Sequence, residues 1–496
     1  MAIRKSRREF LEDSMFAAAA TAAFSAPTAL LAAEEKQSSS PNEKLSVAIV
    51  GLRGRGGSHI NGFGSRKDVE ITHICDADTA FAESRAEAIG NRQGRKPKFV
   101  QDLRKLLEDK SIDVVSIATP NHLHSLQAIW AMQAGKDVYV EKPVSHNVSE
   151  GRRCVEAARK YERICQAGTQ SRSNPGMQEA IAFVQSGKIG DVKVARGLCY
   201  KPRKAIGSAG TYEPPKTVDY NLWLGPAQEQ QVTRPQFHYD WHWQFPFGNG
   251  DLGNQGIQQM DLARWGLGAD EMSHAVISYG GRFGYEDAGD TPNTQVVVHD
   301  YGDRTLVFEV RGLVYDKNLK ESSVSYQGSK IGVIFEGTDG YVVMTTYHSG
   351  SAFDKDGKKI RDFNGGGDQN HYDNFVKAIR SRKVEDLTGD ILEGHLSSAL
   401  CHTGNISYQM GERVSPQECL ERMKAIDTTE NVSATMERVQ DHLRDNGVNL
   451  EKEGVQLGAM MKFDPKTETF VNNDKANQYL SREYRKGFEV PAEGKV

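Results

Sequence analysis

Residues 45–60 read LSVAIVGLRGRGGSHI and decide the fold. The first six residues are mostly apolar and include several β-branched side chains, which predicts a buried strand. Glycines follow at 51, 54, 56 and 57, and a polar helix follows the glycines. Such a turn exposes backbone N–H groups, and the helix N-terminus adds partial positive charge. The pattern therefore favours an anion site that suits a dinucleotide pyrophosphate.

The glycine spacing departs from the usual dinucleotide fingerprint, which asks for glycine at positions 51, 53 and 56. This chain has Arg53 with Gly54 beside it, so a plain glycine-rich loop is the alternative interpretation. The next segment, 68–76, reads as a second strand that ends in Asp76, 25 positions after Gly51. That is near the offset of the carboxylate that binds the adenosine ribose. Strand, glycines, helix, strand and acid in this order predict a bound dinucleotide.

Length and composition bound the class of protein. The chain has 496 residues, 38% of them hydrophobic, and a formal net charge of −4. It is long enough for about three domains, and its near-neutral charge argues against a nucleic-acid partner. The six cysteines include no Cys-x-x-Cys pair, so we expect neither a zinc site nor a disulfide framework and interpret them as mostly buried free thiols.

The first residues have the features of a targeting segment. Residues 6–11, SRREFL, match a twin-arginine export signal, and an alanine-rich run follows to Ala33. The run is too short and too rich in alanine for a good membrane span. We expect a signal peptide over 1–33, a polar linker over 34–44 and export to the periplasm; the alternative is a cytoplasmic protein with a basic start. Twin-arginine export carries folded proteins, so a cofactor can travel inside the protein.

The pattern of strands and helices divides the rest of the chain. Strands and helices alternate over 45–170, which predicts a doubly wound parallel sheet of the Rossmann type, an α/β domain. Over 171–410 strands follow one another, which predicts a second, α+β domain on a large, mainly antiparallel sheet. Two helices, at 369–380 and 393–410, are expected to return to the first domain. Residues 411–496 are charged, and we interpret them as a helical extension.

Two motifs after the glycine turn resemble a known family. TPNHLH at 119–124 and EKP at 141–143 resemble the glucose–fructose oxidoreductase/inositol dehydrogenase/MocA (Gfo/Idh/MocA) family, in its exported bacterial branch. The resemblance implies a two-domain NAD(P)-dependent enzyme that acts mostly on sugars and cyclitols and forms a homo-oligomer. It covers roughly residues 45–410. Further matching segments lie at 220–226, 241–243, 248–261, 393–395 and 401–405.

The resemblance also implies which residues hold the cofactor. The pyrophosphate would lie on the turn formed by Gly51, Arg53, Gly54, Arg55 and Gly56, with the two arginines pairing with phosphate oxygens. Asp76 would bind the adenosine ribose, which favours NAD because a carboxylate repels a 2′-phosphate; the arginines leave NADP as an alternative. The nicotinamide side would be lined by Thr119, Pro120, Asn121, His124, Glu141 and Lys142. His124 is alternatively a helix N-terminal histidine bound to nearby backbone.

Lys142 is the residue that we expect to act in catalysis. Alcohol oxidation removes a hydroxyl proton while hydride leaves carbon, and a lysine beside the nicotinamide binds the substrate oxygen and stabilises developing charge. Burial and the cationic ring would lower the pKa of this lysine. The alternative is a surface lysine in the turn before Pro143.

The second half of the expected catalytic set departs from the family pattern. Many members have an aspartate and a histidine four residues apart, on one face of a helix. This chain has Asn254 and Gln258 there and keeps the later Asp261. Gln258 remains a catalytic candidate by position, and Asn254 and Asp261 are substrate-binding candidates, although an amide is no general base at neutral pH. Either Lys142 carries proton transfer with another group, or dehydrogenase activity is weak or lost.

A histidine among aromatic residues is the candidate for the displaced acid–base. His242 lies between Trp241 and Trp243, four residues after His238. The alternatives are a histidine packed in an aromatic loop, or a metal pair at 238 and 242 that needs further ligands. Aromatic rings stack on sugar C–H faces, so Trp241 is a substrate-binding candidate; core or interface packing is equally compatible with the cluster.

Three hypotheses follow for a small sugar or glycoside as ligand. The first is an exported NAD(P)-dependent oxidoreductase that acts on a sugar hydroxyl or keto group. The second is a glycosidase or lyase that works through a transient keto sugar without net NAD turnover. The third, suggested by Asn254 and Gln258, is a non-catalytic, cofactor-bound sugar binder.

Overall fold

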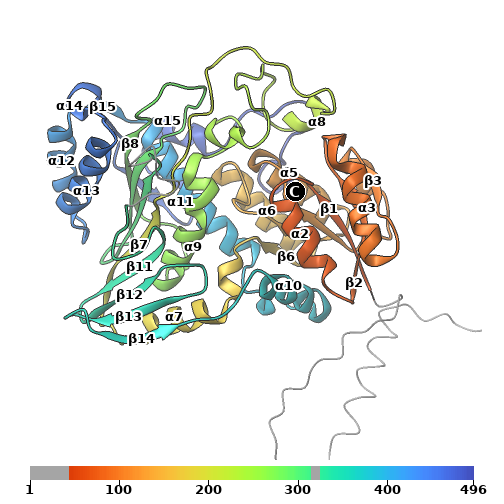
Figure 1. Cartoon of the computed structure of the whole chain (residues 1–496), viewed down its shortest axis with the longest axis horizontal. Coiled ribbons are helices and arrows are strands. Elements are labelled where there is room, and N and C mark those ends of the chain that lie inside the picture. The colour runs from red at the N-terminus through yellow and green to blue at the C-terminus, as the bar shows by residue number, and fades with distance from the viewer. Residues whose placement is uncertain (1–43, 314–323) are drawn as a thin grey trace, which may run out of the picture.

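Figure 1 shows a computed structural model in which residues 44–313 and 324–496 are described. A parallel sheet (red and orange) lies at one end, a larger sheet (green to teal) at the other, and helices lie between them. The predicted signal peptide at 1–33 and all but the last residue of the linker at 34–44 lie outside the described residues. No helix among the described residues is long and apolar enough to cross a membrane.

The first sheet confirms the predicted doubly wound arrangement. Its six parallel strands have the order β3-β2-β1-β4-β5-β6. Residues 47–50 are fully buried because helices cover both faces of the sheet, as expected for a continuous apolar strand. The strands are β1 (Leu45–Val50), β2 (Val69–Cys75), β3 (Lys98–Val100), β4 (Val114–Ile117), β5 (Asp137–Val140) and β6 (Cys165–Ala167). The helices are α2 (Arg55–Gly64), α3 (Ala82–Gln93), α4 (Leu103–Leu107), α5 (His124–Gln133) and α6 (Val148–Lys160).

The second sheet is large and mainly antiparallel, as predicted. Its central strands pair in the order β14-β13-β12-β11-β7-β10-β9-β8, and only the β7–β10 pair is parallel among them. The strands are β7 (Val192–Cys199), β8 (Ala275–Gly281), β9 (Thr294–Asp300), β10 (Thr305–Arg311), β11 (Ile331–Gly337), β12 (Gly340–Met344), β13 (Gly350–Asp354) and β14 (Lys359–Phe363).

Helices α7 (Pro175–Gln185), α9 (Ile257–Gly266) and α11 (Ile391–Gln409) pack on one face of this sheet and form its apolar core. Helix α10 (Gln369–Ser381) returns to the first domain, where Tyr372 packs against Phe63. Helix α11 also contacts α6. Both helices that were expected to return therefore do so.

The segment 411–496 is more than a helical extension, because it also adds strands to the second sheet. Strands β15 (Glu412–Val414), β16 (Val455–Leu457) and β17 (Met461–Asp464) join the β8 edge, and β17 pairs with β18 (Thr469–Phe470). Helices α12 (Pro416–Lys424) and α13 (Val432–Asp445) pack on the sheet face opposite to α9. The short helices α14 (Leu450–Glu453) and α15 (Asp474–Asn477) complete it.

The segment 411–496 also contacts both domains. Arg196 on β7 forms buried ion pairs with Glu309 on β10 and with Glu430 just before α13. The chain end returns to the Rossmann domain, where Phe488 packs near Trp130. The extension therefore covers part of the sheet face opposite to α9 and also contacts the Rossmann domain.

Candidate functional site

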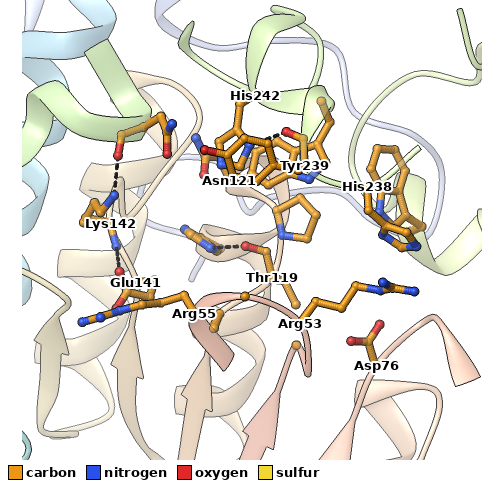
Figure 2. Close-up of a pocket in the computed structure, with 18 residues that line it drawn as sticks. Arg53, Arg55, Asp76, Thr119, Asn121, Glu141, Lys142, His238, Tyr239 and His242 are labelled. Carbon is orange, nitrogen blue, oxygen red and sulfur yellow. Dashed lines mark hydrogen bonds and ion pairs between the residues drawn. The ribbon is translucent and has the colours of Figure 1, made fainter. Parts of the chain in front are cut away.

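A pocket of about 430 Å³ lies at the carboxyl ends of β1, β2, β4 and β5, where the sequence places it. Its upper wall comes from residues 201–247, which we name the roof; the roof includes α8 (Tyr220–Leu224) and lies above the Rossmann strands (Figures 1 and 2). Of the predicted site residues, Gly56, Gln258 and Asp261 do not line the pocket. The predicted residues that do are Gly51, Arg53, Gly54, Arg55, Asp76, Thr119, Pro120, Asn121, His124, Glu141, Lys142, Trp241, His242 and Asn254.

The glycine turn has the geometry that a pyrophosphate needs. A Cβ on Gly51, at φ +89°, would lie 2.6 Å from the carbonyl oxygen of Ala118, and one on Gly56 would meet the carbonyl oxygen of Gly51. Gly54 takes φ +44° at the start of α2, which explains why the middle glycine is displaced by one position. No side chain of the described residues caps α2, although the N–H groups of Gly56 and Gly57 donate to the carbonyl oxygens of Arg53 and Gly54. The turn therefore presents an uncapped helix N-terminus to an anion.

Both arginines of the turn have carboxylate partners. Arg53 Nη2 lies 2.7 Å from Asp78, with its guanidinium over the ring of Phe81. Arg55 binds Glu141 through Nε at 2.8 Å and Asp368 through Nη1 at 2.7 Å. That either arginine binds phosphate oxygens stays a prediction. To do so, the arginine would have to share its guanidinium between the phosphate and the carboxylate, or release the carboxylate.

Asp76 is fixed at the end of β2. Its carboxylate accepts hydrogen bonds from the backbone N–H groups of Leu52, at 2.7 Å, and Asp78, at 2.9 Å. Burial raises the pKa of Asp76 above its ordinary value. His238 of the roof lies 3.0 Å from Asp78, so roof and Rossmann domain meet at this end of the pocket (Figure 2).

Glu141 is the best-connected carboxylate of the site. It binds Arg55, and it accepts hydrogen bonds from His59 Nε2 at 3.1 Å and Gln170 Nε2 at 2.9 Å. Burial alone would raise the pKa of Glu141, but Arg55 and His59 outweigh it and hold the pKa well below the ordinary range. Glu141 is therefore a fixed anion beside the next residue, Lys142.

Lys142 points into the pocket rather than to the surface. Its Nζ donates a hydrogen bond to the carbonyl oxygen of Asn254 (Figure 2). Burial lowers its pKa, although the neighbouring Glu141 opposes the shift. An amino group held in this way exchanges a proton more readily near neutral pH than an ordinary lysine.

The wall near the expected nicotinamide side has one donor without a partner. Asn121 is 4% exposed, and its Nδ2 has no hydrogen-bond partner within the described residues. His124 also lines the pocket, but its ring nitrogens lie 2.7 Å from the carbonyl oxygens of Pro143 and Thr119. These contacts match the alternative in which His124 binds nearby backbone. Together with the glycine turn and Asp76, the free Asn121 donor shows that the residues fit a dinucleotide.

His242 packs against an aromatic ring and still has one ring nitrogen that can accept a hydrogen bond. Its ring stacks on Trp241 at 3.6 Å between centroids, and its Nδ1–H donates to the carbonyl oxygen of Tyr239. Burial lowers the pKa of His242 to about 3, so the ring stays neutral and Nε2 is the acceptor. No group of His, Cys, Asp and Glu among the described residues is arranged to hold a metal ion.

The positions that depart from the family pattern lie in, and two residues after, a π-helical turn, Leu252–Gly256. Asn254 lies in this turn and lines the pocket, whereas Gln258 donates to the carbonyl oxygen of Gly168 and to Gln170 Oε1. Asp261 is bound by Arg172 at 2.8 Å, away from the pocket. The expected shared helix face is lost because the π turn changes the residue spacing.

Sequence reasoning did not identify the partners that hold these groups. Asp78, His59, Gln170 and Asp368 were not singled out, because each acts through a partner distant in sequence. The acidic Asp76-Ala77-Asp78 run was the one signal that could have indicated Asp78.

The roof is fastened on both sides of the pocket. On the Rossmann side, Thr79 N donates to the carbonyl oxygen of Thr217, and Asp219 N donates to that of Ala77. On the second domain, Ala288 N donates to the carbonyl oxygen of Gly207. The roof would therefore cover a dinucleotide on the glycine turn.

Fold and site together define a two-domain protein whose pocket fits a dinucleotide and includes the side chain of Lys142. Residues 45–169 match a family model described as "Oxidoreductase family, NAD-binding Rossmann fold" (GFO_IDH_MocA). The Rossmann domain of this chain is thus similar to the NAD-binding domain of that family.

Comparison with individual proteins gives relatives of more than one kind. Inositol 2-dehydrogenase of Salmonella typhimurium is 29% identical over 176 residues, 35% of this chain and 50% of that protein. Glycosyl hydrolase family 109 protein 1 of Shewanella sp. MR-4 is 32% identical over 156 residues, 30% of this chain and 34% of that protein. The chain thus spans half, or less, of the length of these curated relatives.

A solved levoglucosan dehydrogenase, in complex with NADH and levoglucosan, is also similar to this chain. It has a TM-score of 0.54 at 19% identity and covers 73% of this chain and 97% of its own. At that identity the likeness shows the fold, which extends beyond the Rossmann domain.

Proposed function

We propose that this protein is an NAD-dependent oxidoreductase that transfers a hydride between nicotinamide and a hydroxyl or keto group of a sugar or sugar derivative. The observation that carries the proposal is the position of Lys142, whose buried amino group shares one pocket with the glycine turn and with His242. Relatives named for inositol and levoglucosan support a polyhydroxylated substrate.

Each side chain around the reacting oxygen has a different role. When bound, the nicotinamide supplies the hydride acceptor or donor. In the oxidation direction Lys142 Nζ accepts the hydroxyl proton, and its lowered pKa raises the neutral fraction that can do so. His242 Nε2 accepts a hydrogen bond and orients the hydroxyl, because a ring with a pKa of about 3 is a weak base. Glu141 holds the backbone of this turn in place through Arg55 and His59.

We further propose NAD rather than NADP. Asp76 and Asp78 both lie at the ribose end of the glycine turn, and Arg53 is bound to Asp78. A 2′-phosphate would therefore approach two carboxylates and one arginine that is already paired.

Two measurements test the proposed function. Mass spectrometry of the small molecules released from the purified protein identifies the dinucleotide, and absorbance of the nicotinamide reports hydride transfer across a panel of sugars and cyclitols. We expect the purified protein to release NAD or NADH, and we expect at least one sugar or cyclitol to reduce the bound NAD. Ligand binding without hydride transfer or bond cleavage, unchanged in Lys142→Ala, would instead identify a non-catalytic sugar binder.

A redox-neutral glycosidase or lyase is the second candidate, and the roof favours it. A cofactor covered by a segment fastened on both sides exchanges slowly, which suits a reaction that returns it to its starting state. In that reaction a sugar hydroxyl is oxidised, the neighbouring C–H loses a proton, and the glycosidic bond breaks by elimination. Water then adds, and the ketone is reduced again. Glycoside cleavage with solvent deuterium in the product and no net NADH supports this candidate over the first.

We propose that the protein is exported by the twin-arginine pathway with its cofactor inside. The support is the SRREFL sequence at 6–11 followed by the alanine-rich run. Replacing Arg7 and Arg8 by lysine in the full chain is expected to keep the protein in the cytoplasmic fraction. Unchanged distribution between cell fractions would contradict the proposal.

A further inference from the structure

Charged side chains line the pocket, and each arginine among them is bound to a carboxylate, although Arg55 Nη2 has no hydrogen-bond partner among the described residues. The cations are Arg53, Arg55 and Lys142, and the carboxylates that line the pocket or bind these arginines are Asp76, Asp78, Glu141 and Asp368. The described part of this wall therefore has no surplus of positive charge. A bound dinucleotide adds its pyrophosphate to the negative side.

Lys142 offers less positive charge to a substrate than an ordinary lysine. Its Nζ donates a hydrogen bond to the carbonyl oxygen of Asn254, and burial lowers its pKa, which reduces its charged fraction. The remaining side chains on that side of the pocket, which include Trp241, His242 and Tyr239, are uncharged.

The nearest guanidinium behind this wall is also neutralised. Arg203 binds Asp251 with Nε at 3.2 and 3.1 Å from the two carboxylate oxygens and with Nη2 at 2.5 Å. Its Nη1 lies 3.3 Å from the hydroxyl of Tyr239, and its guanidinium lies over the ring of Trp243. Arg203 thus supports an aromatic wall and has its charge satisfied by Asp251, which is 2% exposed.

We infer that the pocket takes uncharged sugars or glycosides and discriminates against uronic acids and sugar phosphates. The inference rests on the proposed function, and it adds the substrate class. A substrate carboxylate or phosphate would lose its hydration on entering a site whose arginines are already bound to carboxylates, so its desolvation would be poorly compensated. Sugar hydroxyl groups can instead donate to the neutral acceptor His242, and the sugar ring can stack on the aromatic side chains. Like-charge placement of this kind costs about 10-fold or more in affinity.

The test measures binding, so that it does not depend on turnover. Isothermal titration is carried out on the purified NAD-loaded protein with matched pairs: methyl glucoside against methyl glucuronide, and N-acetylglucosamine against its 6-phosphate. The inference predicts that the neutral member of a pair binds and that the anionic member binds at least about 10-fold more weakly. Equal or tighter binding of the anionic members, or binding of none of the sugars, overturns it.

One variant changes the charge behind the wall. Asp251→Asn keeps a hydrogen-bond acceptor but leaves the Arg203 charge unbalanced, so the discrimination is expected to narrow by about 10-fold. Glu70→Gln is the matched control, because it removes one charge from an exposed pair with Arg95 outside the pocket. Should Asp251→Asn fail to fold, Tyr239→Lys adds a cation at an exposed position on the pocket wall and is expected to narrow the discrimination too.

The outcomes separate this inference from the proposed function. Neutral sugars that bind without hydride transfer or cleavage refute the function and support the substrate class. Hydride transfer to a uronic acid or a sugar phosphate, with weaker binding of neutral sugars, supports the function and refutes the substrate class. Discrimination that is unchanged in both pocket variants also contradicts the inference.

Discussion

A methyl group added at Gly51 is expected to disrupt both the fold and the dinucleotide site. Gly51 has φ +89°, and its added Cβ would lie 2.6 Å from the carbonyl oxygen of Ala118 at the end of β4. Gly94, at the end of α3, has φ +85°, but no described atom lies within 4 Å of its added Cβ. The pair therefore separates backbone strain from steric collision.

The magnitudes follow from this difference. A left-handed conformation costs an alanine about 1–2 kcal/mol relative to glycine, which applies to both Gly51→Ala and Gly94→Ala. The collision at Gly51 adds about 1–3 kcal/mol, because β1 and β4 must separate to accept the methyl group. We expect free energies of unfolding lower by about 2–5 kcal/mol for Gly51→Ala and by about 1–2 kcal/mol for Gly94→Ala.

Urea unfolding of both variants measures these losses, and mass spectrometry measures the dinucleotide that each retains. Since about 1.4 kcal/mol corresponds to tenfold in affinity, Gly51→Ala is expected to bind dinucleotide at least about 10-fold more weakly, and Gly94→Ala normally. Equal stability losses, together with full dinucleotide content in Gly51→Ala, would refute the assignment of this turn as the pyrophosphate site.

Three further predictions test other parts of the structure. Asp76→Ser is expected to reduce the preference for NAD over NADP by roughly 10- to 100-fold, because one carboxylate near the 2′ position is removed; an unchanged ratio of the two dissociation constants would count against the ribose assignment. In the oxidation direction the rate is expected to rise with pH, with its midpoint below the ordinary lysine value of 10.5, because burial lowers the pKa of Lys142; a rate that falls with pH excludes Lys142 as the base. Glu309→Gln is expected to lower the free energy of unfolding in urea by about 3–5 kcal/mol at neutral pH, because it removes the carboxylate that binds the buried Arg311, while Arg196 keeps its pair with Glu430. Arginine neighbours outweigh burial and lower the pKa of Glu309 to about 2, so this contribution is full above about pH 5 and is lost as the pH falls toward 2; a difference between wild type and variant that persists at pH 2 contradicts the account.

The fold of the first half was predictable because its signals are local. The apolar run before Gly51 is buried on both faces, and Asp76 follows the next strand as the spacing indicates. The pocket residues carried over from the TPNHLH and EKP motifs line one space because parallel strands place their carboxyl ends at one edge.

The rest depended on contacts that sequence patterns do not report. Strands β15 and β16 have three residues each and form only because the edge of β8 is available to them. The π turn at Leu252–Gly256 moves Gln258 away from the pocket, although helical spacing places it beside Asn254. The carboxylates that bind Arg53 and Arg55 are distant from them in sequence, so these ion pairs could not be predicted from the sequence either.

The central claim is that Lys142 acts on a substrate oxygen next to a bound nicotinamide. The most direct measurement mixes a reactive sugar with NAD-loaded wild type and with Lys142→Met, and follows the absorbance of the bound nicotinamide in a single turnover. Both proteins are expected to contain NAD, and the variant is expected to react about 100-fold or more slowly, the scale of general acid–base catalysis. Reduction of bound NAD at the wild-type rate in Lys142→Met would contradict the account.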